Sequence, residues 1–339
     1  MIEFITLTWY SMCILVFFIR RHAEMKRGIM MPVRYAIVIV TYNRVRLLRE
    51  CIAHAEAQTV RAHSIIVVDN ASTDDTAAYL GELDRVSNIE MIRLQQNIGG
   101  AGGFAKGMER ALQKHVDCVL LIDDDAMIEK EYMEKILTAR EHCPQYRAFA
   151  GTVEKNERID TFHRRDLLRA GLLSKNVPAQ KYCQSRFECD IASFCGMVVD
   201  SELIRKIGLP HEEYFICYDD TEYSLRISRY SRFLVIADAV LDHKSEIHVQ
   251  SCPRRYDWKD YYAIRNRILM VKEHGNIVDE AVNFLDVLVH SVFRNWLFGL
   301  IRLDHYDWKY ERSLVKAAIK DSGGAKPVAG KVSGSVYVK

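Results

Sequence analysis

Three consecutive carboxylates, Asp123–Asp125, directly follow the apolar run Val119–Ile122. An apolar run of this length predicts a buried strand, and open α/β sheets bind ligands at the C-terminal ends of their strands. Adjacent carboxylates repel each other, and a divalent cation that prefers oxygen ligands, Mg²⁺ or Mn²⁺, would relieve this repulsion. Asp123 and Asp125 therefore form a candidate D-x-D metal site. Taken alone, the same residues could also form an ordinary acidic turn after a strand.

A glycine-rich stretch, N-I-G-G-A-G-G at Asn97–Gly103, could bring the backbone close to an anionic ligand. The following residues, Phe104–Lys114, predict a helix, so the glycines would lie at its N-terminus, where free N–H groups favour a diphosphate. The stretch follows the third predicted strand, whereas the dinucleotide fingerprint follows the first, which argues against an ordinary NAD site. A flexible surface loop is the alternative.

Strands and helices alternate from Tyr35 to the acidic run, a pattern that predicts a mainly parallel sheet with helices on both faces. The expected strands are Tyr35–Val40, Ser64–Val68, Ile89–Leu94 and Val119–Ile122, and the expected helices are Arg46–Ala57, Ala77–Leu83 and Phe104–Lys114. The strands are followed by polar residues: Thr41 and Asn43, Asp69 and Asn70, and Asp123–Asp125. Because the C-terminal ends of parallel strands meet at one edge, we expect these residues to form one site.

The composition is that of a globular protein, and its 339 residues provide ample core for one large domain or two smaller ones. The formal net charge of +2 gives no case for nucleic-acid binding. The nine cysteines are scattered without a C-x-x-C pair, which favours reduced core thiols in a cytosolic protein over a zinc site.

The N-terminal segment Met1–Ile19 is almost wholly apolar, with Glu3 as its only charge, and basic residues follow it. Its length is marginal for a membrane span. If the segment is an anchor, the positive charges leave the remainder of the chain in the cytoplasm. The alternative is an upstream start codon, with the native protein beginning near Met30 or Met31.

The C-terminal third contains the apolar segment Ile277–Leu303, which basic residues interrupt. Its periodicity, with Leu285, Leu288, Val292 and Trp296 near helical spacing, predicts a pair of helices. These helices could pack against the rest of the protein, or they could lie in a membrane interface with their basic residues at lipid head groups. The last residues, 322–339, have no periodicity and predict a disordered tail.

Six motifs occur together in an order and spacing that resemble a family 2 glycosyltransferase of the GT-A fold. They are I-V-I-V-T-Y-N-R, I-I-V-V-D-N-A-S-T-D-D-T, N-I-G-G-A-G-G-F, L-L-I-D-D-D, Y-F-I-C-Y-D-D-T-E-Y-S-L-R and D-W-K-D-Y-Y-A-I-R-N. The resemblance covers roughly Val33 to Gly275. It implies an α/β fold for nucleotide-diphospho-sugar transfer, with a mainly parallel central sheet, helices on both faces and additional C-terminal helices.

Within the family, the chain is most similar to galactofuranosyltransferases, and rhamnosyltransferases of cell-surface polysaccharide assembly share much of the pattern. The resemblance implies a nucleotide-sugar donor, with UDP-galactofuranose as first choice, and a lipid-linked glycan as acceptor. dTDP-rhamnose is the alternative donor, for O-antigen or capsule assembly. The expected location is the cytoplasmic face of the cell membrane, and no nucleic-acid partner is expected.

The resemblance assigns donor-binding roles to residues that follow the first strands. The first-strand loop would touch the nucleotide, and Arg44 would pair with the diphosphate. Asp69 would accept a hydrogen bond from the uracil N–H. Asp124 would face the donor sugar, and the glycine-rich stretch would lie near the ribose and the sugar. The full donor-binding set is Thr41, Asn43, Arg44, Asp69, Asn97, Gly99, Gly100, Asp123 and Asp124.

The resemblance also assigns the metal and the catalytic base. Asp123, Asp125 and His243 would hold Mn²⁺ or Mg²⁺, with His243 following the predicted strand Phe233–Leu241, and His248 is the alternative histidine. The pair Asp219 and Asp220 would supply the catalytic base of an inverting transfer. We expect Asp220 to take the proton from the acceptor and Asp219 to assist or to bind the acceptor. The alternative for this pair is a charge feature at a helix N-terminus.

The resemblance extends to further residues, some of which have two interpretations. Ser193–Met197 resembles the acceptor-side strand of the family. Trp258, Tyr261 and Tyr262 could stack on sugar rings or pack in the core. Arg265 could meet a phosphate or form a structural ion pair.

The expected organisation is an apolar N-terminal segment at 1–31, a catalytic domain at 32–275, a helical region at 276–321 and a tail at 322–339. The catalytic domain would consist of a nucleotide-binding half, 32–125, and an acceptor half, 126–275. We predict an inverting, metal-dependent glycosyltransferase. A sugar nucleotidyltransferase and a non-catalytic nucleotide-sugar-binding protein are the alternatives.

Overall fold

The computed structural model describes residues 33–83, 88–168, 170–244, 256–293 and 308–323. The N-terminal segment 1–31, the alternative ligand His248, Trp296 with the rest of the segment beyond 293, and the tail from 324 lie outside the described residues. Within the described ranges, no helix has the length and apolar character needed to cross a membrane.

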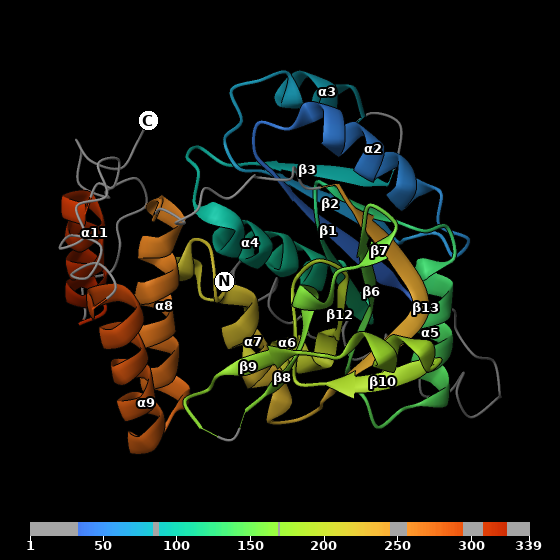
Figure 1. Ribbon diagram of the computed structural model, residues 1–339. Coiled ribbons are helices and arrows are strands. Elements are labelled where there is room, and N and C mark those ends of the chain that lie inside the picture. Colours follow the sequence, from blue (N-terminus) through green and yellow to red (C-terminus); the bar gives the residue numbers. More distant parts are fainter. Residues whose placement is uncertain (1–32, 84–87, 169, 245–255, 294–307, 324–339) are drawn as a thin grey trace, which may run out of the picture. The chain divides into compact units, whose positions relative to one another are not determined.

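The first half of the described chain alternates strands and helices, as the sequence predicts (Figure 1). The strands are β1 (Tyr35–Thr41), β2 (Ser64–Asp69), β3 (Ile89–Arg93) and β4 (Cys118–Asp123), and the helices are α2 (Val45–Glu56), α3 (Thr76–Leu83) and α4 (Gly99–Gln113). β1 pairs in parallel with both β2 and β4, and β2 pairs in parallel with β3. This arrangement confirms the expected parallel sheet with helices packed on it.

The second half of the sheet is mixed in direction. The strands that continue it are β5 (Ala126–Ile128), β6 (Ala148–Lys155), β7 (Arg158–Ile159), β10 (Arg186–Cys189), β12 (Met197–Asp200) and β13 (Phe233–His243). The order across the whole sheet is β10-β13-β6-β12-β4-β1-β2-β3, with β5 paired to β13 and β7 paired to β6. β12 is antiparallel to β4 and to β6, whereas β13 and β6 are parallel. β8 (Arg164–Leu167), β9 (Ser174–Asn176) and β11 (Ile191–Ala192) form a separate small sheet.

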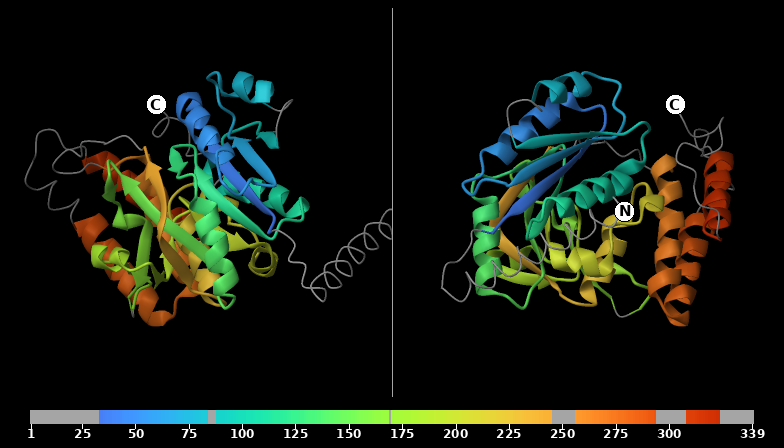
Figure 2. Two further views of the ribbon diagram at one scale, coloured as in Figure 1. Left: turned by 90° about the vertical axis from the view of Figure 1, so that its right-hand side faces the viewer. Right: turned by 180° about the vertical axis from the view of Figure 1, so that it is seen from behind.

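Helices of the second half cover the sheet and extend beyond it. They are α5 (Tyr132–His142), α6 (Ser201–Ile207), α7 (Asp219–Ser228), α8 (Trp258–His274), α9 (Ile277–Val287), the π-helical turn η4 (Leu288–Phe293) and α11 (Trp308–Asp321), with short 3₁₀ turns η1 (Thr161–His163), η2 (Ala179–Cys183) and η3 (Glu212–Tyr214). α8, α9 and α11 pack side by side at the C-terminal end of the described chain (Figures 1 and 2).

Helix α4 begins at Gly99, so the expected helix start at Phe104 is wrong. The glycines of this helix allow it to approach β1 closely. A Cβ atom added to Gly103 would lie 2.5 Å from Val40 Cγ1, and one added to Gly107 would lie 2.2 Å from Val38 Cγ1. The helical glycines that the sequence indicates as a ligand-binding loop therefore also serve the packing of α4 on the sheet.

The central strands form the core and hold the site rigidly. All residues of β1 and β2 are buried, and β4 is buried up to the half-buried Asp123. These strands are rich in Val and Ile, whose branched side chains pack well on a pleated surface that is covered on both faces. A rigid sheet of this kind fixes the position of the polar residues that follow each strand.

Candidate active site

The C-terminal ends of three neighbouring strands bring the predicted polar residues together. Thr41 at the end of β1 is in register with Asp69 at the end of β2, and Val40 is in register with Asp123 at the end of β4. Sequence spacing separates these strands by tens of residues, but their parallel pairing aligns their ends. The expected convergence at one edge of the sheet is therefore present.

Asp124 is buried and is held by the loop after β1. Thr41 Oγ1 donates a hydrogen bond of 2.7 Å to Asp124 Oδ2, and Arg44 Nη1 donates one of 3.2 Å to Asp124 Oδ1. The same Arg44 atom lies 2.8 Å from Asp125 Oδ2. Arg44 is half-exposed and acts as a counter-ion of the acidic run.

Strand β13 carries His243 to the acidic run. Its pairing with β5 places His243 opposite Ala126, and His243 Nε2 lies 3.2 Å from Asp125 Oδ1. Ligand atoms of Asp123, Cys195 and His243 lie within 4.8 Å of one another, close enough for one ion to reach all three. The structure thus brings Asp123 and His243 together with Cys195, and it places Asp125 beside His243.

Burial and mutual repulsion perturb the carboxyl groups of this cluster. Burial, together with the charge of Asp125, raises the pKa of Asp123 to about 7. Burial also raises the pKa of Asp124 to about 6, even though Thr41 and Arg44 oppose the shift. Burial acts in the same direction on Asp125, but contacts with His243 and Arg44 outweigh it and lower the pKa of Asp125. A cation at this position would offset the repulsion between the carboxylates.

The donor atoms fit a divalent cation. His243 Nδ1 is buried and has no hydrogen-bond partner among the described residues, and the buried Asp125 Oδ1 has His243 Nε2 as an ion-pair partner at 3.2 Å. Carboxylate oxygens and an imidazole nitrogen suit Mn²⁺, and carboxylate oxygens suit Mg²⁺. Asp123, Asp125 and His243 are accordingly the residues that would hold such an ion.

A second acidic pair begins helix α7. Asp219 and Asp220 lie in its first turn, after Tyr218, which adopts the left-handed conformation with φ of 64°. Burial and the neighbouring charge of Asp220 raise the pKa of Asp219 well above its usual range. Asp220 Oδ1 accepts a hydrogen bond of 2.9 Å from Thr221 Oγ1 and lies 3.9 Å from Arg165 Nη2. The two carboxyl groups therefore occupy different environments.

A likeness to known proteins identifies the class of enzyme. The sequence profile described as "Glycosyl transferase family 2" matches residues 36–207, which is half of the chain and contains β1, β2, β4 and the acidic run. The chain belongs to glycosyltransferase family 2. The glycosyltransferase is thus an enzyme that transfers sugars, which confirms the resemblance seen in its motifs.

The glycosyltransferase is similar in sequence to a rhamnosyltransferase and to galactofuranosyltransferases. It is 25% identical over 244 residues to the dTDP-rhamnosyl transferase RfbF of Shigella flexneri, covering 70% of this chain and 79% of that protein. It is 30% identical over 196 residues to the galactofuranosyltransferase GlfT1 of Mycobacterium tuberculosis, covering 57% and 64%. It is 25% identical over 230 residues to the galactofuranosyltransferase GlfT2 of Mycolicibacterium smegmatis, covering 61% of this chain and 34% of that protein.

Solved structures support the fold. GalNAc-T7, crystallised with UDP, GalNAc and Mn²⁺, aligns with a TM-score of 0.56 at 13% identity, covering 71% of this chain and 48% of that one. S. aureus TarS 1–349, crystallised with UDP-GlcNAc, aligns with a TM-score of 0.53 at 17% identity, covering 87% and 82%. At this identity the likeness concerns the fold, and it confirms the expected GT-A architecture.

The remaining predicted donor-site residues of the glycosyltransferase surround the ends of β1 and β2. Asp69 is buried, and its Oδ1 accepts a hydrogen bond of 2.8 Å from the backbone of Ser72. Its Oδ2 has no hydrogen-bond partner among the described residues, although Arg93 Nε lies 3.7 Å away. Asn43 Oδ1 accepts a hydrogen bond of 2.7 Å from the backbone of Thr73, so Asn43 shapes the turn after β2.

The start of α4 is tied to the loop that precedes the second acidic pair. Asn97 Oδ1 accepts a hydrogen bond of 2.8 Å from the Gly99 backbone. Gly99 has φ of +78°, and a Cβ atom added there would lie 2.0 Å from the carbonyl oxygen of Phe215. Nothing lies within 4 Å of a Cβ atom added to Gly100, so the backbone there is open to a ligand. Asn70 also fixes this start, because its side chain bonds the Ile98 N–H and the Gly99 carbonyl.

Sequence reasoning missed the role of Asn266, which lies within the motif D-W-K-D-Y-Y-A-I-R-N. Its buried Nδ2 lies 2.8–2.9 Å from the carbonyl oxygens of Tyr214, Ile216 and Cys217. Positive φ angles at Phe215, Cys217 and Tyr218 strain this loop, and such strain persists only where surrounding contacts over-determine the backbone. Asn266 therefore holds the strained loop that leads into the second acidic pair.

Arg265 supports Asn266 and the backbone that precedes the second acidic pair. Its Nη1 donates to the Glu213 carbonyl at 3.0 Å and to Asn266 Oδ1 at 2.6 Å. The buried rings of Tyr261 and Tyr262 belong to a hydrophobic cluster with α11, as the core-packing interpretation expects, whereas Trp258 is exposed. The contact of Arg265 with the backbone depends on the packing of α8 against η3, which the sequence does not predict.

Cys195 was also missed as a neighbour of the metal ligands. It belongs to the Ser193–Met197 segment, and only tertiary packing brings its sulfur to Asp123 and His243. Burial raises the pKa of its thiol well above the usual value, with the charge of Asp123 adding to the shift. A neutral thiol is a poor ligand for the hard cations that the carboxylates favour, so Cys195 lines the site without being needed as a ligand.

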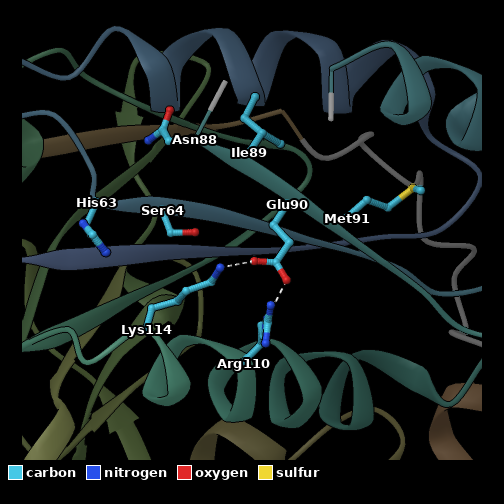
Figure 3. Close-up of a pocket in the computed structure, with 8 residues that line it drawn as sticks. All are labelled: His63, Ser64, Asn88, Ile89, Glu90, Met91, Arg110 and Lys114. Atoms are coloured by element: carbon cyan, nitrogen blue, oxygen red, sulfur yellow. Dashed lines mark hydrogen bonds and ion pairs between the residues drawn. The ribbon is translucent and has the colours of Figure 1, made fainter. Parts of the chain in front are cut away.

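A surface pocket lies at the other edge of the same sheet (Figure 3). It contains Ser64, the first residue of β2, whereas the active site contains Asp69, the last residue of that strand. Glu90 in this pocket is paired with Arg110 and Lys114 of α4 and its C-cap. The pocket is thus separate from the candidate active site and its carboxylate is neutralised by its own neighbours.

Proposed function

We propose that this family 2 enzyme is an inverting, metal-dependent glycosyltransferase that moves galactofuranose from UDP-galactofuranose to a lipid-linked glycan at the cytoplasmic face of the membrane. The observation that carries the mechanism is the pair of distinct acidic sites. One, Asp123–Asp125 with His243, has crowded carboxylates and metal-type donor atoms. The other, Asp219 and Asp220, is a carboxyl pair at a helix start that is held by a strained loop.

The donor would bind at the ends of β1, β2 and β4. Asp69 Oδ2 accepts no hydrogen bond within the described residues and is available to accept one from the uracil N–H. Arg44 can turn from the acidic run to the diphosphate, because a guanidinium pairs with phosphate oxygens. The open backbone at Gly100 allows close approach of the ribose or the sugar. Mn²⁺ or Mg²⁺, held by Asp123, Asp125 and His243, would stabilise the charge of the leaving diphosphate.

The acidic pair would activate the acceptor. Asp220 takes the proton of the acceptor hydroxyl while the hydroxyl oxygen bonds to the anomeric carbon. The bond from that carbon to the diphosphate oxygen breaks, and its electron pair leaves with UDP, which inverts the anomeric centre. The raised pKa of Asp219 favours its protonated form, so Asp219 can donate a hydrogen bond to an acceptor oxygen.

The second candidate is rhamnosyl transfer from dTDP-rhamnose. It is favoured by the match to the dTDP-rhamnosyl transferase of Shigella flexneri, which covers a larger share of the relative, 79%, than the matches to the galactofuranosyltransferases do. Galactofuranosyl transfer is favoured by the higher identity to GlfT1 and by the repeated matches to GlfT1 and GlfT2. Membership of a glycosyltransferase family favours both over nucleotidyl transfer and over non-catalytic binding.

The test is donor turnover by the purified protein with Mn²⁺, offering UDP-galactofuranose, UDP-galactopyranose, UDP-glucose and dTDP-rhamnose separately. We expect hydrolysis or transfer with UDP-galactofuranose and its loss on chelation of the metal. Turnover of dTDP-rhamnose alone would keep the mechanism and replace the donor. Activity that persists at full rate in a chelator would contradict the metal site.

A further inference from the structure

Helix α9 has its polar side turned inward and its apolar side turned outward. Its buried residues are Asp279, Asn283 and Val287. Large apolar side chains of α9 and η4 are exposed, from 42% at Leu288 to 84% at Ile277. The exposed set, which we name the outer apolar face, is Ile277, Val278, Phe284, Leu285, Leu288, Val289 and Phe293. A surface helix of a globular protein normally shows the opposite arrangement.

Polar contacts fix this orientation. Asn276 and Asp279 cap the helix through a reciprocal capping box, and Asp279 also accepts a hydrogen bond from the Gly171 backbone. Asp286 pairs with Arg267 of α8. If α9 rolled to bury its apolar side, Asp279 and Asp286 would lose their contacts with Gly171 and Arg267, which is costly. The outer apolar face is therefore a fixed surface of the protein.

The helix next to this surface exposes basic side chains. Arg312, Lys316 and Lys320 of α11 are exposed and spaced four residues apart, so they share one helix face. α11 packs against α8 and η4. Basic side chains beside an apolar surface are typical of helices that lie in a membrane interface.

We propose that the outer apolar face of α9 and η4 docks on an anionic lipid bilayer, with the basic side chains of α11 at the head groups. This proposal deepens the proposed function, since a lipid-linked acceptor would then be presented beside the acidic pair. Arg267 of α8 pairs with Asp286 of α9, and α8 also contacts α7, the helix that begins with the acidic pair.

The test is co-sedimentation of the full chain with vesicles of phosphatidylcholine, with and without phosphatidylglycerol. We expect binding that is stronger with phosphatidylglycerol. Phe284→Asp combined with Leu288→Asp should lower the partition coefficient by at least about tenfold, because the transfer of each large apolar side chain is worth roughly a factor of ten. The matched control is Ile159→Asp combined with Tyr230→Asp, which charges two exposed apolar side chains elsewhere and should leave binding unchanged.

A second variant separates the electrostatic part. Arg312→Gln, Lys316→Gln and Lys320→Gln together should lower binding to vesicles with phosphatidylglycerol and leave binding to phosphatidylcholine alone unchanged. Equal binding by the α9 double variant and the native chain would overturn the proposal. A native dimer that the double variant converts to a monomer, with no change in vesicle binding, would also overturn it, because the face would then bind a second copy of the chain.

Donor hydrolysis without acceptor separates this proposal from the proposed function. The double variant should hydrolyse the donor at the native rate, because the substituted side chains lie outside the donor site. Vesicle binding through α9 in a protein that turns over no sugar nucleotide would support the docking surface and contradict the proposed function. Donor turnover by a protein whose vesicle binding is unchanged by the α9 substitutions would support the proposed function and contradict the docking surface.

Discussion

Asp219 and Asp220 are adjacent in sequence, yet their surroundings give them different chemistry. Asp219 is desolvated and its pKa is raised, whereas Asp220 contacts Thr221 and lies near Arg165. A proton acceptor and a hydrogen-bond donor can therefore stand side by side. Two neighbouring carboxyl groups with divergent environments are a common arrangement for acid–base work.

The first prediction concerns the base. Asp220→Asn should lower the rate of transfer by about 10²–10⁴-fold, because the acceptor hydroxyl loses its proton acceptor. Affinity for UDP, measured by calorimetry with Mn²⁺, should stay near the native value, since the donor site is formed by other strands. Transfer at the native rate would remove Asp220 from this role.

The second prediction concerns the pH dependence of stability. The pKa of Asp219 is higher in the folded protein than in the unfolded chain, so the folded state binds more protons and loses stability as pH rises through this interval. Asp219→Asn imitates the protonated acid and removes this loss. Its melting temperature should exceed that of the native protein by more at about pH 8 than at about pH 4. A difference that does not change with pH would contradict the raised pKa.

At the scale of elements, the second acidic pair depends on contacts from two helices that are distant in sequence. The start of α4 touches the Phe215 carbonyl, and α8 binds the same loop through Asn266. The loop itself has three non-glycine residues with positive φ before α7 begins. Helix α7 is therefore placed by its neighbours as much as by its own sequence.

The third prediction compares two adjacent glycines. Gly99→Ala puts a Cβ atom 2.0 Å from the Phe215 carbonyl oxygen at a residue with φ of +78°, so it should destabilise the fold by more than about 1 kcal/mol and lower activity by moving the loop. Gly100→Ala meets nothing within 4 Å and should leave the melting temperature close to native. Equal melting temperatures for the two variants would contradict the close contact between α4 and the loop.

The fourth prediction concerns Asn266 as a positioning residue. Asn266→Leu removes the hydrogen bonds to three carbonyl groups and should lower kcat more than it changes the donor KM, because it acts on the base through the loop. The cost in stability should be about 2 kcal/mol or more. Asn266→Gln offers the same amide and should restore part of kcat. Equal kcat values for the Asn266→Leu and Asn266→Gln variants would indicate a purely structural role.

At the scale of the whole molecule, the cluster of Asp123, Asp125 and His243 joins segments that are far apart in the sequence. β4 supplies Asp123, the residues after it supply Asp125, and β13 supplies His243, more than a hundred residues later in the sequence. The pairing of β13 with β5 sets the approach of the histidine to the carboxylates. The acidic run and the end of β13 thus meet at this junction.

The fifth prediction tests that junction. His243→Ala should weaken Mn²⁺-dependent binding of UDP by at least about tenfold, since it removes a donor atom beside Asp125. His142→Ala, on the exposed surface of α5, is the matched control and should bind UDP as the native protein does. UDP affinity that is independent of Mn²⁺ in the native protein would contradict the cluster as a metal site.

The sequence by itself determined the parallel half of the fold and the residues at its functional edge. Runs of Val, Ile and Leu predict buried strands from local composition, and the polar residues after them are visible in the same stretch. Parallel pairing then aligns the ends of the strands with no further information, which is why Thr41, Asp69 and Asp123 converge as expected. Family membership also follows from ordered local motifs.

Only the tertiary structure decided which distant residues support or surround these groups. The glycines of α4 pack on β1, Cys195 lies beside Asp123 and His243, and Asn266 binds the loop before α7. The outward apolar side of α9 likewise depends on polar partners at Gly171 and Arg267. Local sequence patterns do not predict these contacts or the orientation of α9. Helical periodicity fixes which side chains share a face, whereas packing against other elements fixes which face is turned inward.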